Sequence, residues 1–260
     1  MTHPLDGCFL KLDRAGAHLA ALEEVVREVA GPEPDSLPGE LDHAGGRHLF
    51  RAQRDRRTPL ALSAIVGDAV HNLFTALDYL AWELAVLHRG SGDTWTAFPI
   101  FEDREKYQEE APKKVRRLHS DAQALVERVQ PFQVPQAKQH RSEHPLARLY
   151  ALEQRDKHRT LNLTTISASG RLCGLPPHIH TPPGYSGFPR GSYERGEVLA
   201  SLSGFASDPP PRVALEVIHE VAFAEGGPAA GQEVLGTLGG IVQHVRLVVS
   251  RFERFFPSRV

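Results

Sequence analysis

The polar side chains best suited to chemistry lie in one otherwise apolar segment, residues 58–90. At about 100° per residue of helix, they fall within an arc of roughly 120°. The set consists of Asp68, His71, Asn72, Thr75, Asp78, Tyr79 and Trp82. An imidazole that is oriented by a carboxylate is a common general acid or base. Because the rest of the circumference is apolar, the segment predicts a helix inside a bundle, with its polar stripe facing a shared interior or cleft.

A second group of ionisable side chains closes a predicted helix over residues 144–156, in the run RDKHR. It contains Asp156, His158 and Arg159. Because buried carboxylates need partners, we expect the polar stripe to meet these basic groups. The catalytic candidates are His71, His158 and Asp78, and the binding candidates are Asp68, Asn72, Asp156 and Arg159.

Three interpretations of this cluster are open. In the first, Arg159 and Lys157 neutralise the carboxylates of the stripe, and the network only fixes the register of the helices. In the second, His71 or His158 acts as general acid or base beside a carboxylate. In the third, histidine and aspartate side chains ligate a metal ion. The ligands would be His71, Asp78, Asp156 and His158, and the sequence identifies neither the metal nor any cofactor.

The elements that position these residues include five predicted helices. Alternating spacings of three and four residues mark the first of them as the partner of another helix. The central helix ends at Gly90, since glycine readily takes the left-handed conformation that closes a helix. Residues 91–101 predict an edge strand or an extended segment that packs Trp95, Phe98, Ile100 and Phe101. The helices span residues 6–30, 58–90, 112–130, 144–156 and 232–256.

Between the last two helices the pattern changes to β-branched residues with partial alternation, which predicts three to four antiparallel strands. Residues 31–46 read as an irregular connector, and residues 47–57 as a short basic strand or an extended approach. The prediction is an α+β protein, in which a bundle of about five helices has a small antiparallel sheet inserted before the C-terminal helix. The strands cover residues 161–169, 197–203 and 213–224.

The terminal helix has no core of its own, so we expect it to return to the bundle and complete a single domain over residues 1–260. Within that domain, residues 1–159 form the bundle core, residues 160–228 the sheet and residues 229–260 the returning helix. An exposed side of the first or last helix also offers a surface for a homodimer.

Composition excludes several classes of protein. Hydrophobic residues make up 41% of the chain and charged residues 24%, and the formal charge is -2. These values describe a soluble globular protein and lack the basic excess of a DNA-coating protein. Cys8 and Cys173 are too few for a disulfide scaffold, and no apolar run reaches the ~18 residues of a membrane span. We therefore expect a cytoplasmic protein without membrane contact.

Residues 113–117, KKVRR, form a compact basic run. In the predicted helix over residues 112–130 they occupy the first turns, where the helix dipole disfavours positive charge. That placement indicates a contact with an anionic group, whereas a solvated face is the commoner use of a charge run.

Four motifs resemble an uncharacterised family of mostly actinobacterial proteins: GDAVHNLFTALDYLAWEL at residues 67–84, FPIF, QPF and RDKHR. That family shares a GDxxHNLRSALDHL-type segment, FPI and DKHR, and the likeness covers roughly residues 10–159. Its RSALDH pattern has an Arg-x4-His spacing similar to that of HEPN-type ribonucleases and toxins, which are helical bundles that cut RNA without a metal. The two positions are Phe74 and Tyr79 here, so the resemblance implies a degenerate, non-cleaving member. Thr75 and Asp78 match the pattern, but they cannot replace a cationic Arg at a phosphate.

Taken together, the sequence favours a binding or interaction module with a polar Asp/His/Arg site between the central helix and the RDKHR turn. RNA or a small anionic ligand is the expected partner. The alternative is an enzyme, either a HEPN-like or a metal-assisted nuclease or hydrolase, that works through His71 and His158.

Overall fold

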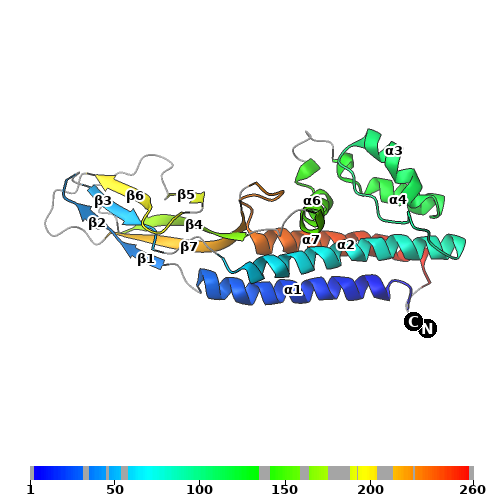
Figure 1. Ribbon diagram of the computed structural model, residues 1–260, viewed down its shortest axis with the longest axis horizontal. Coiled ribbons are helices and arrows are strands. Elements are labelled where there is room, and N and C mark those ends of the chain that lie inside the picture. The colour runs from blue at the N-terminus through cyan, green and yellow to red at the C-terminus, as the bar shows by residue number, and fades with distance from the viewer. Residues whose placement is uncertain are drawn as a thin grey trace.

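The computed structural model describes residues 3–31, 35–44, 47–53, 58–134, 141–158, 164–174, 188–191, 193–203, 213–224 and 226–257. The molecule is elongated, with helices packed lengthwise in a bundle and two small sheets extending from one end of it (Figure 1). The described residues form six α-helices and two antiparallel sheets, which confirms the α+β class. They do not form the single inserted sheet that the sequence predicts.

Three long helices run lengthwise through the bundle, and a shorter helix packs across them (Figure 1). The first two lie side by side, and the other two pack against them. The seam predicted for the first helix is largely correct, because Leu12, Ala15, Leu22 and Val26 are buried. The four helices are α1 (Asp6–Ala30), α2 (Leu60–Arg89), α6 (Pro145–His158) and α7 (Val234–Phe252), which a 3-10 turn, η2 (Glu253–Phe255), extends.

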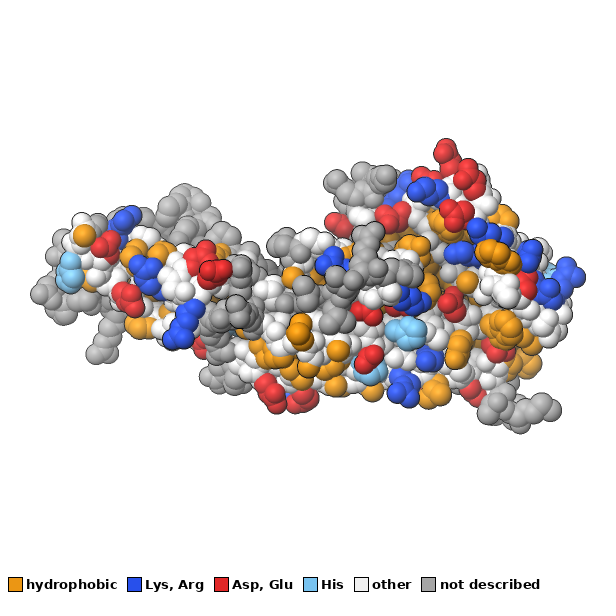
Figure 2. Space-filling view, in the orientation of Figure 1, with side chains coloured by type: hydrophobic (Ala, Val, Ile, Leu, Met, Phe, Trp, Pro, Cys, Tyr) orange, Lys and Arg blue, Asp and Glu red, His pale blue; other side chains and the backbone are white. Residues whose placement is uncertain are grey.

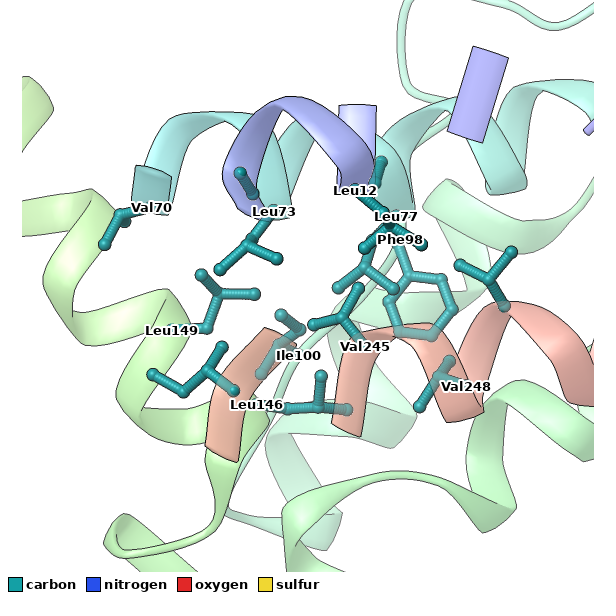
Figure 3. Close-up of a cluster of buried hydrophobic side chains, with 14 of the residues drawn as sticks. Leu12, Val70, Leu73, Leu77, Phe98, Ile100, Leu146, Leu149, Val245 and Val248 are labelled. Atoms are coloured by element: carbon teal, nitrogen blue, oxygen red, sulfur yellow. The ribbon is translucent and has the colours of Figure 1, made fainter. Parts of the chain in front are cut away.

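The core of the bundle also contains the extended segment that follows α2. Figure 3 shows Phe98 close to Leu77 of α2 and Val248 of α7. Phe98 and Ile100 are 2% and 5% exposed, as the sequence predicts. Full burial of an apolar side chain of this size stabilises a fold by about 1.5–3 kcal/mol. Trp95 does not join them, since it is 56% exposed.

The central helix closes as predicted. Gly90 has φ of 75°, in the left-handed region, and its N–H donates to the carbonyl oxygen of Val86 at 2.8 Å. By length and composition, α2 is the one helix in the described ranges that is long and apolar enough to cross a membrane, which the sequence argument missed. Within the bundle, 56% of its apolar window is buried, as in the core helix of a soluble protein, so it is a weak indication of a span.

Two short helices replace the single helix predicted over residues 112–130. α3 (Arg104–Val115) begins early because the Asp103 side chain accepts hydrogen bonds from two backbone N–H groups of the first turn. α4 (Ser120–Arg128) begins separately, with His119 as the capping acceptor. A 3-10 turn, η1 (Pro131–Gln133), follows.

This division reverses the place of the basic run 113–117. It lies at the C-terminal end of α3 rather than in the first turns of a helix. The helix dipole favours cations at that end. The sequence argument for an anionic contact, which relied on the opposite polarity, was therefore wrong.

Each sheet combines strands that precede α2 in the sequence with strands that follow it. One has the order β1-β7-β4-β5 and the other the order β2-β3-β6, both antiparallel. Residues 31–46, predicted as an irregular connector, supply two of these strands, because β7, distant in sequence, pairs with the first and the neighbouring β3 pairs with the second. The strands are β1 (Asp35–Pro38), β2 (Glu40–Asp42), β3 (Arg47–Arg51), β4 (Thr164–Cys173), β5 (Phe188–Gly191), β6 (Val198–Ser203) and β7 (Ala214–Phe223).

The two sheets enclose a second, smaller apolar cluster. Phe50 of β3 and Leu215 and Val217 of β7 have no exposed surface within it. Farther along β7, Val221 and Phe223 belong to the core of the helical bundle. One long strand thus contributes to both clusters and connects the sheets to the helices that carry the candidate site.

Candidate functional site

The candidate site lies where α6 packs against α2, and its centre is a residue that the sequence did not indicate. Leu146, Leu149 and Leu152 on α6 are fully buried. Glu153 follows at the spacing of the same helical face, and its side chain has no exposed surface. A carboxylate therefore occupies a core position of α6.

Two basic side chains meet this carboxylate. Lys157 Nζ lies 2.7 Å from Glu153 Oε1, and His71 Nδ1 lies 3.2 Å from the same oxygen. Among the described residues, Glu153 Oε2 has no hydrogen-bond partner. Removing a carboxylate from water costs several kcal/mol unless its hydrogen bonds are replaced, so this network is only half satisfied.

His71 connects the buried carboxylate to solvent. Its side chain is 54% exposed, and its Nε2 lies 3.5 Å from Thr75 Oγ1, one turn along α2. A carboxylate at Nδ1 favours the tautomer that carries its proton there. Nε2 is then a proton acceptor on the outer side of the site, which is the arrangement of a general base.

Asp156 adds a second carboxylate beside α2. An ideal Cβ on Gly67 would lie 2.8 Å from Asp156 Oδ1, so the absence of a side chain at Gly67 admits this approach. Burial raises the pKa of Asp156, and the charges of Glu153 and Asp68 raise it further, while His71 lowers it. Asp156 Oδ1 is buried and has no hydrogen-bond partner in the part of the chain that the structure describes.

Aromatic rings border the cluster. The ring centroids of Phe74 and Tyr150 are 6.4 Å apart, and Lys157 Nζ lies 5.0 Å from the Phe74 centroid. Tyr150 is 39% exposed. We call this arrangement the Glu153 site: His71, Glu153, Asp156 and Lys157, bordered by Phe74 and Tyr150.

The predicted site residues are only partly brought together. His71 and Asp156 belong to the Glu153 site. Asn72 does not, because its side chain donates to the carbonyl oxygen of Asp68 and faces Lys11 of α1, 3.4 Å away. The Asp68 side chain is exposed, and its effect on the site is electrostatic, because its charge raises the pKa of Asp156.

Asp78 has a described structural contact, and its predicted catalytic role stays a prediction. Its Oδ1 accepts a hydrogen bond from the backbone N–H of Phe98 at 3.0 Å, which ties the extended segment to α2. Burial raises the pKa of Asp78, against the hydrogen bond from Phe98 and the charge of Lys157. The side chain of His158 and all of Arg159 lie outside the described residues, so their roles stay predictions.

No group of three or more His, Cys, Asp or Glu side chains in the described ranges is arranged to hold a metal ion. The predicted metal site would also need His158, whose side chain is outside those ranges. Elsewhere, an open groove of about 880 Å³ lies between the start of α1 and the second half of α2, bordered by Asp6, Phe9, Tyr79 and Glu83. Tyr79, the second position of the HEPN-like pattern, therefore lies in a different place from Phe74.

The chain matches no protein-family model, and comparisons with the curated proteins and with the solved structures give no match. The function is therefore inferred from the site.

Proposed function

We propose that this chain is a binding protein that holds a small polar ligand at the Glu153 site. The observation that carries the proposal is the pair of buried carboxylate oxygens, Glu153 Oε2 and Asp156 Oδ1, that no described residue satisfies. An unpaired buried acceptor costs about 1–3 kcal/mol. A network kept only for stability would be expected to close on itself, whereas a ligand with N–H or O–H donors removes this cost.

The charges narrow the class of ligand. Burial and the charges of Glu153 and Asp68 together disfavour ionisation of Asp156, as its raised pKa indicates. The negative potential that these carboxylates create suits a protonated amine, a guanidinium or a group of hydroxyls. Such a ligand fits the described side chains better than the RNA or small anion expected from the sequence.

Solvent reaches the site from its outer edge. The side chains of His71 and Lys157 are 54% and 40% exposed, and Tyr150 adds a half-exposed ring. A ligand entering here would contact aromatic carbon on one side and carboxylate oxygen at the bottom, a combination typical of small-molecule sites.

The test uses native mass spectrometry and thermal unfolding with matched compounds. We expect a bound small molecule, or a rise in Tm with amines or polyols but not with the corresponding carboxylates. Glu153→Gln combined with Asp156→Asn should abolish the response, because it removes both charges at similar volume. Glu24→Gln, on the exposed side of α1, is the control. An equal response in the double variant would refute the proposal.

A second candidate is an acid–base hydrolase or nuclease centred on His71. The observation in its favour is the series Glu153 Oε1, His71 and Thr75 Oγ1, with contacts of 3.2 and 3.5 Å. Lys157 adds a cation beside Phe74, where the similar family has Arg. In this reading His71 removes a proton from Thr75 or from a water, and Glu153 stabilises the imidazolium.

Cleavage assays with RNA, phosphodiesters and esters test the enzyme. His71→Ala should abolish turnover while the melting temperature stays near that of the wild type. Thr75→Val separates a hydroxyl nucleophile from a water nucleophile, since only the former needs the Thr75 oxygen. Assays with and without divalent cations, together with His158→Ala, test the metal-assisted variant. Unchanged turnover in both histidine variants would remove these residues from the mechanism.

A further inference from the structure

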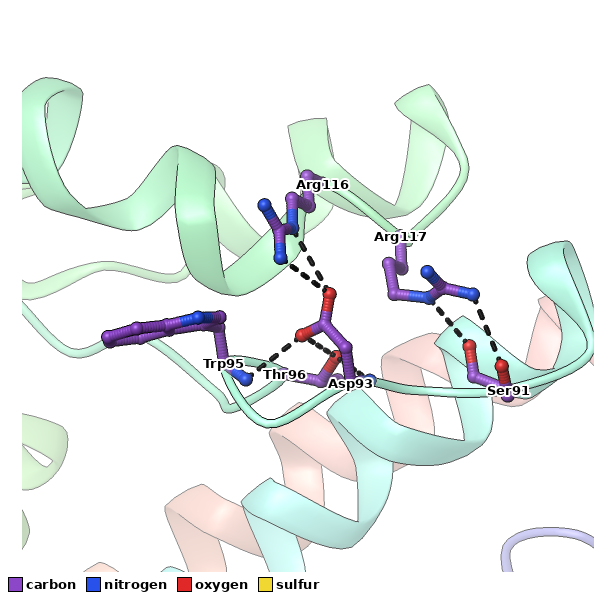
Figure 4. Close-up of polar contacts among 6 residues, drawn as sticks. All are labelled: Ser91, Asp93, Trp95, Thr96, Arg116 and Arg117. Carbon is purple, nitrogen blue, oxygen red and sulfur yellow. Dashed lines mark hydrogen bonds and ion pairs between the residues drawn. The ribbon is translucent and has the colours of Figure 1, made fainter.

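A second surface, distinct from the Glu153 site, lies at the far end of the bundle. Figure 2 shows Lys and Arg side chains gathered over the end of the molecule that carries α3 and α4. The turn over residues 91–96, which we call the Trp95 turn, packs against the end of α3 (Figure 4). Trp95 is 56% exposed there, more than any other Phe, Tyr or Trp side chain that the structure describes.

The Trp95 turn is built around one carboxylate. Asp93 Oδ1 accepts hydrogen bonds from the backbone N–H of Trp95 at 2.9 Å and from Thr96 Oγ1 at 3.1 Å. Asp93 Oδ2 accepts two from Arg116, at 3.1 and 2.9 Å. Burial raises the pKa of Asp93, but these hydrogen bonds outweigh it and hold the pKa below its usual value. The indole is thus presented by a rigid turn, on the opposite side of Asp93 from Arg117 (Figure 4).

The cations beside the Trp95 turn differ in how far their charges are compensated. Arg116 is neutralised by Asp93, whereas Arg117 is held by neutral groups, the carbonyl oxygen and Oγ of Ser91, at 2.8 and 3.1 Å. Lys113 Nζ lies 5.6 Å from the Trp95 ring centroid. Neither Lys113 nor Arg117 forms an ion pair with a carboxylate within the described chain. The surface therefore combines an exposed ring with two uncompensated positive charges.

We propose that the Trp95 turn and the end of α3 bind a single-stranded nucleic acid, with a base stacked on Trp95 and phosphates at Lys113 and Arg117. Base stacking on an aromatic ring beside cations that follow the backbone is the usual mode of single-strand binding. An acidic protein partner would use the cations alone and would leave the indole without a role. The proposal is independent of the ligand at the Glu153 site.

The first test is fluorescence quenching by oligouridylate and oligothymidylate at low salt. Trp82 and Trp95 are the two tryptophans, so Trp82→Phe makes Trp95 the reporter. Anisotropy of a labelled strand with the unaltered chain gives the affinity independently of that substitution. For two phosphate contacts on a single strand, log K should fall with log salt with a slope of about -1.4, and Lys113→Ala should halve it.

Substitutions of Trp95, with an exposed arginine elsewhere as the control, test whether the strand binds at this surface. Trp95→Ala should weaken binding roughly 5- to 150-fold, and Trp95→Phe by less, because one stacked base contributes that range. Arg14→Ala, an exposed charge on α1, should leave the affinity unchanged. Binding of either oligonucleotide supports the proposal, and a preference for oligouridylate or for oligothymidylate identifies the ligand as RNA or DNA. No binding at low salt, equal loss in Arg14→Ala, or equal binding of oligoglutamate overturns it.

Discussion

Lys157 Nζ lies 2.7 Å from Oε1 of Glu153, whose side chain has no exposed surface, while the Lys157 side chain is 40% exposed. The ion pair therefore reaches from the core of the bundle to solvent. Replacing a buried ion pair by apolar residues is often neutral or stabilising. A buried glutamate at this position is thus expected to add little to stability, which favours a role in binding or catalysis.

Removing the lysine alone should be costly. Lys157→Met leaves the Glu153 carboxylate buried with only the half-exposed His71 beside it, and we expect a loss of about 2–4 kcal/mol in the free energy of unfolding. Urea denaturation measures it. Lys106→Met, an exposed lysine on α3, is the matched control and should change stability little.

The same loss should vanish when the carboxylate is absent. Glu153→Leu leaves no buried charge, so adding Lys157→Met to it should cost less than about 1 kcal/mol. The double-mutant cycle then gives a large coupling energy between the two residues. Equal costs of Lys157→Met in both backgrounds would contradict the assigned pairing.

A neutral isostere of Asp78 should be tolerated. Its raised pKa means that the folded state holds the proton more tightly than the unfolded state. Asp78 thus favours folding below about pH 4, and this contribution is lost as the pH rises through its folded pKa. Asp78→Asn keeps an acceptor for Phe98 N–H and has no charge, so it should match or exceed wild-type stability near neutral pH.

Urea denaturation at a series of pH values checks this. The difference between Asp78→Asn and wild type should shrink toward about pH 4 and below, where the aspartate is protonated. Asp13→Asn, whose carboxylate pairs with Arg246 on the surface, should show no such trend toward greater stability at neutral pH. A variant that is less stable than wild type at neutral pH would show that the charge itself holds the extended segment.

The sequence predicts elements that carry their own periodicity. The seam of α1, the closure of α2 at Gly90 and the alternation in β7 all follow from local patterns. β1 and β2 are too short to show a pattern, and they exist because β7 and β3 pair with them. The division at residues 116–119 was missed because apolar spacing continued through it, while the caps at Asp103 and His119 decided where helices begin.

The candidate site shows the same limit. His71 was predicted from the polar stripe, but its partner is on α6, and Glu153 looks like an ordinary surface glutamate in the sequence. Its signal is the position: it continues the face of Leu146, Leu149 and Leu152, with a lysine one turn later. Asp78 was assigned to the site because it shares the stripe, and the sequence did not indicate that its Oδ1 also accepts a hydrogen bond from the backbone N–H of Phe98.

Two glycine substitutions should separate helix propensity from packing. Gly16→Ala on α1 meets no atom within 4 Å, so it should stabilise the protein by about 0.5–1 kcal/mol. Gly67→Ala gains the same propensity but places a methyl group 2.8 Å from Asp156 Oδ1, which must move. We expect a smaller gain or a loss in Tm, together with weaker ligand binding at the Glu153 site. Equal stabilisation by both variants would contradict the close packing of Asp156 on α2.

Acid should loosen α6 through a pair of histidines. The ring centroids of His144 and His244 lie 4.8 Å apart, nearly perpendicular. Burial lowers the pKa of His144 to about 4, with a contribution from His244, and burial and Arg251 lower the pKa of His244. A lowered histidine pKa stabilises the fold fully above about pH 6.5, and this contribution is lost as the pH falls toward 4.

The loss has a local cause. His144 Nδ1 accepts a hydrogen bond from the backbone N–H of Leu146 at 3.2 Å at the start of α6, and a protonated ring cannot accept it. Because the group is partly exposed, we expect on the order of 1–2 kcal/mol between pH 6.5 and 4. His144→Asn keeps a capping acceptor without titrating, so its stability should vary less over this range.

Unfolding measured at both ends of the range decides the matter, with His119→Asn as the control because His119 caps the start of α4 in the same way. The control should retain the wild-type pH dependence. If His144→Asn also retains the wild-type pH dependence of stability, the acid sensitivity of the bundle comes from other groups. If it is lost only in His144→Asn, protonation at the start of α6 weakens the helix that carries Glu153, and ligand binding at that site should weaken over the same pH range.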